Sequence, residues 1–327
     1  MKNWKCEMRN AKWGRSCPSA ARRAGEHSSF FFIPALLFGM FFGFAGPPET
    51  RGPQYGKNPA FPSVPGYRLA VHPLHNPGKL MQAYQPLIEY LNARLKGARL
   101  ELEASRSYAN FEEKIHARSP EFLLPNPWQT LQAIKDGYAV VAMAGEAQDF
   151  KGIFIVRKGS GIKQPSDLKG KAVSYPSPTA LAACIMPQYF LFRHGLDINK
   201  DIENRYVGSQ ESSIMNAFLG KTAAGATWPP PWRAFQNDHP NEAAELEVAW
   251  ETEPLINNSV MVRNDVPADI RDRVRALLVG LHETAEGRSI LAGVETARFL
   301  PASDEDYNMV RDYVAQFEKD VRPVEPR

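Results

Sequence analysis

From residue 66 onward, short apolar runs alternate with amphipathic segments. In residues 78–96 the apolar side chains recur at helical spacing, on a face that holds Leu80, Tyr84, Leu87, Ile88, Leu91 and Leu95. The pattern predicts helices at 78–96, 108–117 and 127–136, and strands at 67–72, 99–104, 121–124, 139–144 and 151–157. This strand and helix rhythm favours a largely parallel sheet covered by helices.

A second set of elements follows a short turn at residues 166–170. Its predicted strands are 171–175, 203–207, 223–227, 245–251 and 259–263, and its predicted helices are 179–194, 210–219, 229–237, 268–281, 284–292 and 304–320. Two such sets predict an α/β protein with two lobes, each a mixed, mostly parallel sheet flanked by helices. In such a protein the ligand binds in a central cleft at the carboxyl ends of strands, and the lobes close about a hinge.

An apolar run at residues 30–46 follows a segment with seven lysines and arginines. It holds about 15 apolar residues, fewer than the roughly 20 that a membrane-spanning helix needs. Gly43 and Ala45 suit cleavage after Ala45, so residues 1–45 are predicted to be a signal peptide, with an uncleaved N-terminal anchor as the alternative. Residues 46–65 are rich in Pro and Gly and are predicted to be a disordered linker. We therefore expect an exported, periplasmic protein.

The charge balance changes when this leader is set apart. The whole chain has 39 Lys and Arg against 36 Asp and Glu, a formal charge of +3. Residues 1–45 hold seven of the basic and two of the acidic side chains, so the remainder has 32 and 34, a charge of −2. The basic excess belongs to the leader, and the sequence offers no basic patch that would indicate nucleic-acid binding.

Motifs for catalysis or metal binding are missing. Cys184 is the one cysteine outside the predicted leader and is expected in the core, beside Ile185. The sequence has no Gly-x-Ser-x-Gly elbow, no phosphate-loop lysine and no His-Glu-x-x-His. We therefore predict a binding protein with no catalytic residues, no metal site and no cofactor.

Five short stretches occur in a characteristic order between residues 66 and 320. They are Ser107-Tyr108-Ala109-Asn110-Phe111-Glu112, Gly161-Ile162-Lys163-Gln164-Pro165-Ser166-Asp167-Leu168-Lys169-Gly170-Lys171, Met186-Pro187-Gln188-Tyr189-Phe190, Gly208-Ser209-Gln210-Glu211 and Gly220-Lys221-Thr222-Ala223-Ala224-Gly225-Ala226-Thr227-Trp228. In these stretches the chain resembles the phosphate/phosphite/phosphonate solute-binding proteins of ABC importers, the PhnD-like group.

The resemblance implies a type II periplasmic binding protein that acts as a monomer. Lobe one would comprise residues 66–154 and 254–327, and lobe two residues 155–253. The protein would pass a small ligand to a membrane permease. The alternative is a sensor that reports ligand occupancy to a histidine kinase.

The family binds its oxyanion at a Ser/Thr-rich helix start, through hydroxyl and backbone N–H groups. The resemblance places this run at Thr179-Ala180-Leu181-Ala182, where one hydroxyl remains, with Ser177 before it; Ser177, Thr179 and Ala180 are the candidate contacts. The family's Gly-x-His-Glu is here Gly208-Ser209-Gln210-Glu211, and its Gly-Lys-Val-Asp is Gly220-Lys221-Thr222-Ala223, so a histidine and an acidic partner are missing. A desolvated oxyanion needs hydrogen bonds and compensating charge. This cleft offers less of both than the family does. The resemblance implies an oxyanion or phosphonate-like ligand, and the missing groups keep a cation or a neutral solute as alternatives.

Strand-to-helix junctions supply further candidate ligand contacts. Tyr108 matches a ligand-facing tyrosine of the family, with a capping or packing role as the alternative. Asn126 precedes Trp128, which would form a wall of the cleft or else staple the helix start. Gln210 and Glu211 open a helix that faces the cleft, although Glu211 also suits any helix N-terminus.

Two aromatic candidates complete the set. Trp228 begins the stiff segment Trp228-Pro229-Pro230-Pro231-Trp232 and would present an aromatic face to the ligand, including a cationic one. The alternative is that Trp228 caps its strand and Trp232 lies in the core. His75 follows His72 by three residues and would hydrogen-bond the ligand or be solvated, and two histidines alone do not make a metal site.

Overall fold

The computed structural model describes residues 64–324. The predicted signal or anchor segment, 1–45, and the predicted linker up to residue 63 lie outside the described residues. Among residues 64–324, no helix combines the length and the hydrophobicity needed to cross a membrane.

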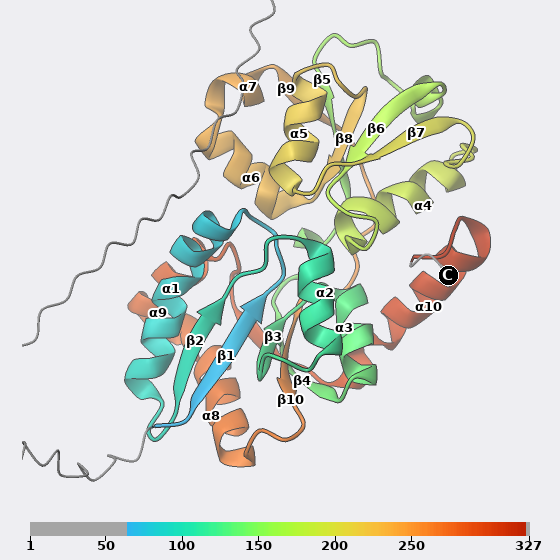
Figure 1. The fold of residues 1–327 in the computed structure, drawn as a ribbon. Helices are drawn as coiled ribbons and strands as arrows, with labels where there is room; N and C mark the ends of the chain where they lie inside the picture. The colour runs from blue at the N-terminus through green and yellow to red at the C-terminus, as the bar shows by residue number, and fades with distance from the viewer. Residues whose placement is uncertain (1–63, 325–327) are drawn as a thin grey trace, which may run out of the picture. The chain divides into compact units, whose positions relative to one another are not determined.

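The first of two sheets has six strands in the order β11-β4-β10-β3-β1-β2 (Figure 1). Strands β1, β2 and β3 run parallel, whereas β10 is antiparallel to β3 and β4, and β11 is antiparallel to β4. Helices α1, α8 and α9 cover one face, and α2, α3 and α10 cover the other. We call this sheet with its helices lobe one. Its elements are β1 (Gly66–Val71), α1 (Pro77–Arg94), β2 (Arg99–Glu103), α2 (Tyr108–His116), β3 (Phe122–Leu124), α3 (Pro127–Lys135), β4 (Tyr138–Ala144), β10 (Ser259–Arg263), α8 (Ala268–Val279), α9 (Ala285–Gly293), β11 (Phe299–Pro301) and α10 (Asn308–Asp320).

The second sheet has five strands in the order β7-β6-β8-β5-β9 and forms lobe two with its helices. Strand β6 is parallel to β7 and β8, whereas β5 is antiparallel to β8 and β9. Its elements are β5 (Ile153–Arg157), β6 (Lys171–Tyr175), α4 (Met186–Arg193), β7 (Ile202–Tyr206), α5 (Gln210–Phe218), β8 (Ala224–Thr227), α6 (Pro229–Asp238), α7 (Pro240–Ala244) and β9 (Leu246–Glu251). The predicted α/β fold with two mixed sheets is confirmed.

Side-chain caps start four helices directly after strands. Asn76, Ser107, Asn126 and Ser209 accept hydrogen bonds from backbone N–H groups of α1, α2, α3 and α5, respectively. Such caps satisfy donors that the first helical turn cannot satisfy itself. These short polar residues therefore fix where each helix begins, at the carboxyl end of the preceding strand.

The predicted helix 179–194 differs from the observed structure at its start. It begins with a π-helical turn, Leu181–Ile185, and becomes α-helical only at Met186. Pro187 has no N–H with which to bond the carbonyl four residues earlier, and the wider π turn accommodates this loss. The predicted helix 304–320 likewise starts as a 3₁₀ turn, Asp304–Tyr307, before α10.

Strand pairing places the first crossing between lobes before Ile153. The predicted boundary between residues 154 and 155 falls inside β5, whose residues from Ile153 onward pair with β8 and β9 of lobe two. The return crossing, between β9 and β10, contains the predicted position at 253/254. The division into two hinged lobes stays a prediction.

The C-terminal segment contacts both lobes, although the prediction assigned it to lobe one. Helix α10 packs on α3, and its Phe317 and Tyr313 meet Tyr189 of α4 edge to face. Beyond α10, the guanidinium of Arg322 donates to Gln188 Oε1 at 2.8 Å and to the Pro178 carbonyl at 3.0 Å, both in lobe two. The sequence pattern predicted the helix but carried no signal for its partner.

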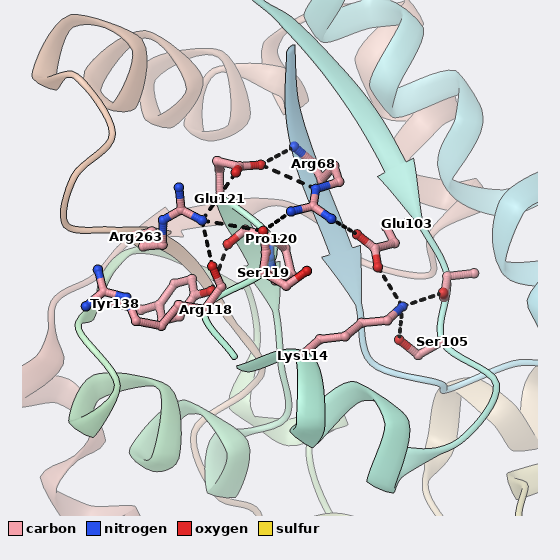
Figure 2. A network of polar contacts seen from close by, with 11 residues as sticks. Arg68, Glu103, Ser105, Lys114, Arg118, Ser119, Pro120, Glu121, Tyr138 and Arg263 are labelled. Atoms are coloured by element: carbon pink, nitrogen blue, oxygen red, sulfur yellow. Dashed lines mark hydrogen bonds and ion pairs between the residues drawn. The ribbon is translucent and has the colours of Figure 1, made fainter. Parts of the chain in front are cut away.

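A polar network holds the connections around α2 (Figure 2). The Glu121 carboxylate accepts a hydrogen bond from the Arg68 backbone N–H at 2.8 Å, and it lies 3.2 Å from Arg263 Nη1. Both arginines also donate to carbonyl groups that follow α2, at Ser119 and Arg118. Lys114, in the last turn of α2, pairs with Glu103 at 2.7 Å and donates to Ser105 Oγ at 3.0 Å, and both partners precede the helix. These bonds fix the loops on both sides of α2 and therefore the position of its first residue, Tyr108.

Close packing of α5 on β8 leads to a stability prediction. A Cβ on Gly225 would lie 2.2 Å from the Ser213 carbonyl oxygen, in a region that Ser213 and Ser174 fill with hydrogen bonds to backbone carbonyls. Gly225→Ala should cost roughly 2–3 kcal/mol of unfolding free energy through overpacking. Urea denaturation checks this, with Gly66→Ala as the control because no atom lies within 4 Å of its Cβ position. Equal midpoints for Gly225→Ala and wild type would contradict the packing.

Candidate ligand-binding site

A small pocket lies where the two lobes meet. Strand ends and helix starts from both lobes form it, so residues far apart in sequence come together. We call it the helix-start pocket, and its lining residues are His72, Tyr108, Asn126, Phe150, Ala180, Leu181, Ala182, Ala183, Gln210 and Trp228. Five predicted contacts, Tyr108, Asn126, Ala180, Gln210 and Trp228, therefore lie around one pocket.

One wall is the first turn of the helix that runs through the π turn into α4. The N–H groups of a first turn have no helical acceptor and carry the positive end of the helix dipole. Ala180, Ala182 and Ala183, which line the pocket together with Leu181, carry only methyl side chains, so an anion can approach the backbone of these alanines closely. The arrangement suits an oxyanion bound by main-chain donors.

A chain of hydrogen bonds leads to the Tyr108 hydroxyl. Thr227 Oγ1 donates to Gln210 Oε1 at 2.8 Å, and Gln210 Nε2 donates to Tyr108 OH at 3.0 Å. Because the Tyr108 oxygen accepts from Gln210, its own proton can be donated to another acceptor. Burial raises the pKa of Tyr108, which is 3% exposed, so the hydroxyl keeps that proton at neutral pH.

His72 adds a neutral ring to the same pocket. Burial lowers the pKa of His72 to about 4, despite a backbone hydrogen bond that opposes the shift. Its Nδ1 lies 3.0 Å from the Leu124 carbonyl oxygen, which can only accept, so Nδ1 carries the proton. Nε2 is then the acceptor of the ring. Sequence analysis weighed His72 together with His75 for a metal, for a hydrogen bond to the ligand and for a solvated or packed role, and it did not select His72.

Polar contacts cross between the lobes beside this pocket. Asn126 Nδ2 donates to the Thr179 carbonyl at 3.3 Å, and Thr179 Oγ1 donates to Glu112 Oε1 at 2.6 Å. Ser177 Oγ lies 3.0 Å from Thr179 Oγ1. Ser177 and Thr179 therefore lie next to the helix start, and their hydroxyls bond within the protein. Glu112, which sequence analysis missed as a site residue, anchors this contact.

Trp228 packs against Phe150, with ring centroids 5.5 Å apart, and both line the pocket. Trp128 does not line it: its side chain is 2% exposed within the core of lobe one. This burial favours the packing alternative for Trp128. Trp232 stacks on Phe235 in a separate hydrophobic cluster of lobe two.

His75 and Glu211 line a neighbouring depression instead of the helix-start pocket. There Lys79 of α1 forms an ion pair with Asp238 of α6, across the two lobes. Burial, followed by the positive charge of Lys79, lowers the pKa of His75 to about 4. Glu211 lies 3.3 Å from His239 Nε2. Within residues 64–324, no group of three His, Cys, Asp or Glu side chains is arranged to hold a metal ion.

Arg322 supports the helix start from behind and was also missed by sequence analysis. Its bond to the Pro178 carbonyl holds the segment before Ala180, and its guanidinium lies 3.6 Å from the Cys184 sulfur. Cys184 is buried as expected, and burial raises the pKa of its thiol to about 12. The sequence carried no signal for these contacts because Arg322 is more than 130 residues away from both Pro178 and Cys184.

Comparison with known proteins identifies the class and the family. Crystal structures of periplasmic binding proteins share the fold: a binding protein of an ABC phosphonate transporter from Pseudomonas aeruginosa has a TM-score of 0.72 at 14% identity, with 79% of this chain and 88% of that chain covered. PhnD1 from Prochlorococcus marinus, in complex with methylphosphonate, has a TM-score of 0.71 at 18% identity, with 78% and 98% covered. The fold is thus that of a type II periplasmic binding protein.

The family model "ABC transporter, phosphonate, periplasmic substrate-binding protein" matches residues 69–307, and the chain belongs to this family. A curated relative, the probable ABC transporter phosphite binding protein PhnD1 of Prochlorococcus marinus, is 23% identical over 186 residues, which are 53% of this chain. The match spans 63% of that relative's length. Family membership confirms the predictions of a small-molecule-binding protein rather than an enzyme, and of a location outside the cytoplasm.

The neutral state of buried His72 predicts a pH dependence of stability. The unfolded imidazole titrates near 6.5 and the folded one near 4, so the unfolded state takes up the proton first. The contribution of His72 is present above pH 6.5 and is lost as the pH falls toward 4, by about 2 kcal/mol at pH 5. His72→Asn keeps a donor near the Leu124 carbonyl but cannot titrate.

Urea denaturation at pH 7 and pH 5 measures this effect. Wild type should lose about 2 kcal/mol more unfolding free energy between these pH values than His72→Asn. His75 remains in both proteins, so its titration cancels in the comparison. Equal losses in the two proteins would show that His72 does not stay neutral in the folded state.

Proposed function

We propose that this protein binds a small phosphonate or a related oxyanion in the helix-start pocket and delivers it to the permease of an ABC importer. The observation that carries the proposal is the Tyr108 hydroxyl, whose proton is left to donate because its oxygen accepts from Gln210. It stands at a pocket that also contains the helix start at Ala180–Ala183. Donors from both lobes thus converge where an anion would bind.

The missing family hydroxyls and histidine are compatible with this ligand. Backbone N–H groups at Ala182 and Ala183 replace hydroxyl donors, and His72 supplies an acceptor rather than a positive charge. A monoanionic phosphonate carries both oxygens that accept and one protonated oxygen that donates. It therefore matches a pocket with a tyrosine donor, main-chain donors and one imidazole acceptor.

Ligand entry requires the lobes to separate. The pocket is small, and Tyr108–Gln210, Asn126–Thr179 and Lys79–Asp238 join the two lobes around it. Hinge motion at the two crossings would break these contacts and open the cleft. The bound ligand would then add a further link between the two lobes.

The relatives support the transport role. One solved neighbour is described as holding methylphosphonate and the curated relative as binding phosphite. We infer that this chain works as a monomer with a membrane permease. These relatives favour transport over the alternative role, a sensor that signals to a histidine kinase. An N-terminal signal peptide or anchor, residues 1–45, would place it at the periplasmic face of the membrane.

Isothermal titration with methylphosphonate, ethylphosphonate, phosphite and phosphate tests the proposal. Tyr108→Phe should weaken binding at least about tenfold, because a hydrogen bond to a charged group is lost. Tyr313→Phe is the matched control, since its ring packs against Tyr189 and does not line the pocket. No binding of any of these oxyanions by wild type, or unchanged affinity in Tyr108→Phe, would overturn the proposed function.

A further inference from the structure

The described C-terminal end of the chain belongs to lobe one but is fixed to lobe two. Helix α10 ends beside α4 (Figure 1), where the Tyr189 hydroxyl donates to Asp320 Oδ2 at 3.1 Å. We call the next four residues, 321–324, the C-terminal strap. Asn199 Nδ2 of lobe two donates to the Val321 carbonyl at 3.1 Å. The strap therefore keeps its place on lobe two through side chains that are distant in sequence.

Arg322 of the strap contacts the chain on both sides of the segment that lines the helix-start pocket. Its Nη2 donates to the Pro178 carbonyl at 3.0 Å and lies 3.6 Å from Cys184 Sγ. The pocket-lining residues 180–183 lie between these two contacts in the sequence. Its Nε donates to Gln188 Oε1 at 2.8 Å, one turn further along the helix. The guanidinium is thus held against the helix start at three points.

The positive charge of Arg322 is not neutralised by its surroundings. Within residues 64–324 it forms no ion pair, and its remaining hydrogen bonds go to the neutral carbonyl groups of Pro323 and Val324. The π turn and α4 both lack acidic residues in their first turns. Burial raises the pKa of the Cys184 thiol to about 12, so the sulfur is neutral as well. The field of this guanidinium therefore extends to an anion in the pocket.

A cation in this place is unfavourable unless an anion binds. The start of a helix carries the positive end of the helix dipole, which favours acidic side chains and disfavours basic ones. A guanidinium beside the helix start adds to the same positive potential. From lobe one, the Glu112 carboxylate accepts from Thr179 Oγ1 at 2.6 Å, and its negative charge would repel an anion. Arg322 offsets this repulsion.

From these contacts we propose that Arg322 is a positioning residue for the ligand: its charge, held behind the helix start by the C-terminal strap, raises the affinity of the helix-start pocket for anions. Arg322 does not line the pocket, so it acts through the segment that it holds and through its field. The inference rests on the proposed function. It assigns the compensating positive charge that a desolvated oxyanion needs.

Two substitutions that remove the net charge in different ways test this role. Arg322→Gln removes the guanidinium but keeps a donor, whereas Gln188→Glu keeps the acceptor of Arg322 and places a negative charge beside it. In isothermal titration both should weaken methylphosphonate binding about tenfold. Arg322→Lys keeps the charge and should lose no more than about threefold. Arg311→Gln, which removes an exposed arginine from α10, is the control and should bind as wild type does.

Phosphorus NMR of saturated complexes separates the effect of charge from support of the backbone. The second ionisation of methylphosphonate changes its ³¹P shift, and a nearby positive charge favours the doubly ionised form. The titration midpoint of the bound ligand should rise by about one pH unit in Arg322→Gln and stay within about 0.3 of wild type in Arg322→Lys. Loss of a purely structural contact would weaken binding without moving this midpoint.

The outcomes distinguish this role from the proposed function. If wild type binds methylphosphonate and Gln188→Glu keeps full affinity, or if the midpoint in Arg322→Gln does not move, the role of Arg322 is overturned and the proposed function stands. Thermal melting shows whether each variant folds, and Gln188→Glu with Arg322→Lys decides the question if Arg322→Gln does not. If wild type binds no oxyanion, the proposed function fails and the role of Arg322 fails with it.

Discussion

The structure depends on hydrogen bonds between polar groups of the two lobes. These bonds form where the strand ends and helix starts of one lobe face those of the other. Helix starts expose unpaired N–H groups, and strand ends carry short polar caps, so neither lobe can bury this surface alone. Asn126, Thr179 and Glu112 satisfy one another between the lobes, as do Tyr108 and Gln210. This pairing leaves some hydrogen-bond donors without an acceptor in the protein, and these donors determine which ligands can bind.

Two cavities share one tryptophan, Trp228. The helix-start pocket contains the Tyr108 hydroxyl and the helix start at Ala180, whereas the neighbouring cavity contains Asp149, Asn258 and Glu295. Burial acts in both, lowering the pKa of His72 to about 4 and raising the pKa of Glu295 to about 7. In each case burial disfavours the charged form of the side chain. A bound ligand with complementary groups would shift the equilibrium between the charged and neutral forms.

The strand and helix pattern predicted most elements because each is stabilised by local rules. Caps at Asn76, Ser107, Asn126 and Ser209 are visible in the sequence, and so is the apolar face of α1. Elements without such signals were missed: β11 has three residues and ends in proline, and α7 has five. Their conformations depend on neighbouring strands and helices rather than on their own periodicity.

By itself, the sequence determined the alternation of strands and helices, the capped helix starts and the five motifs that indicate the family. The tertiary structure alone decided which candidates meet: it brought Tyr108 to Gln210, buried Trp128 in a core and moved His75 and Glu211 to a separate depression. It also placed Glu295, Asn258 and Arg322, which no motif singled out. The physical reason is range: periodicity and capping act over a few residues, whereas these contacts join residues about a hundred or more positions apart and depend on packing.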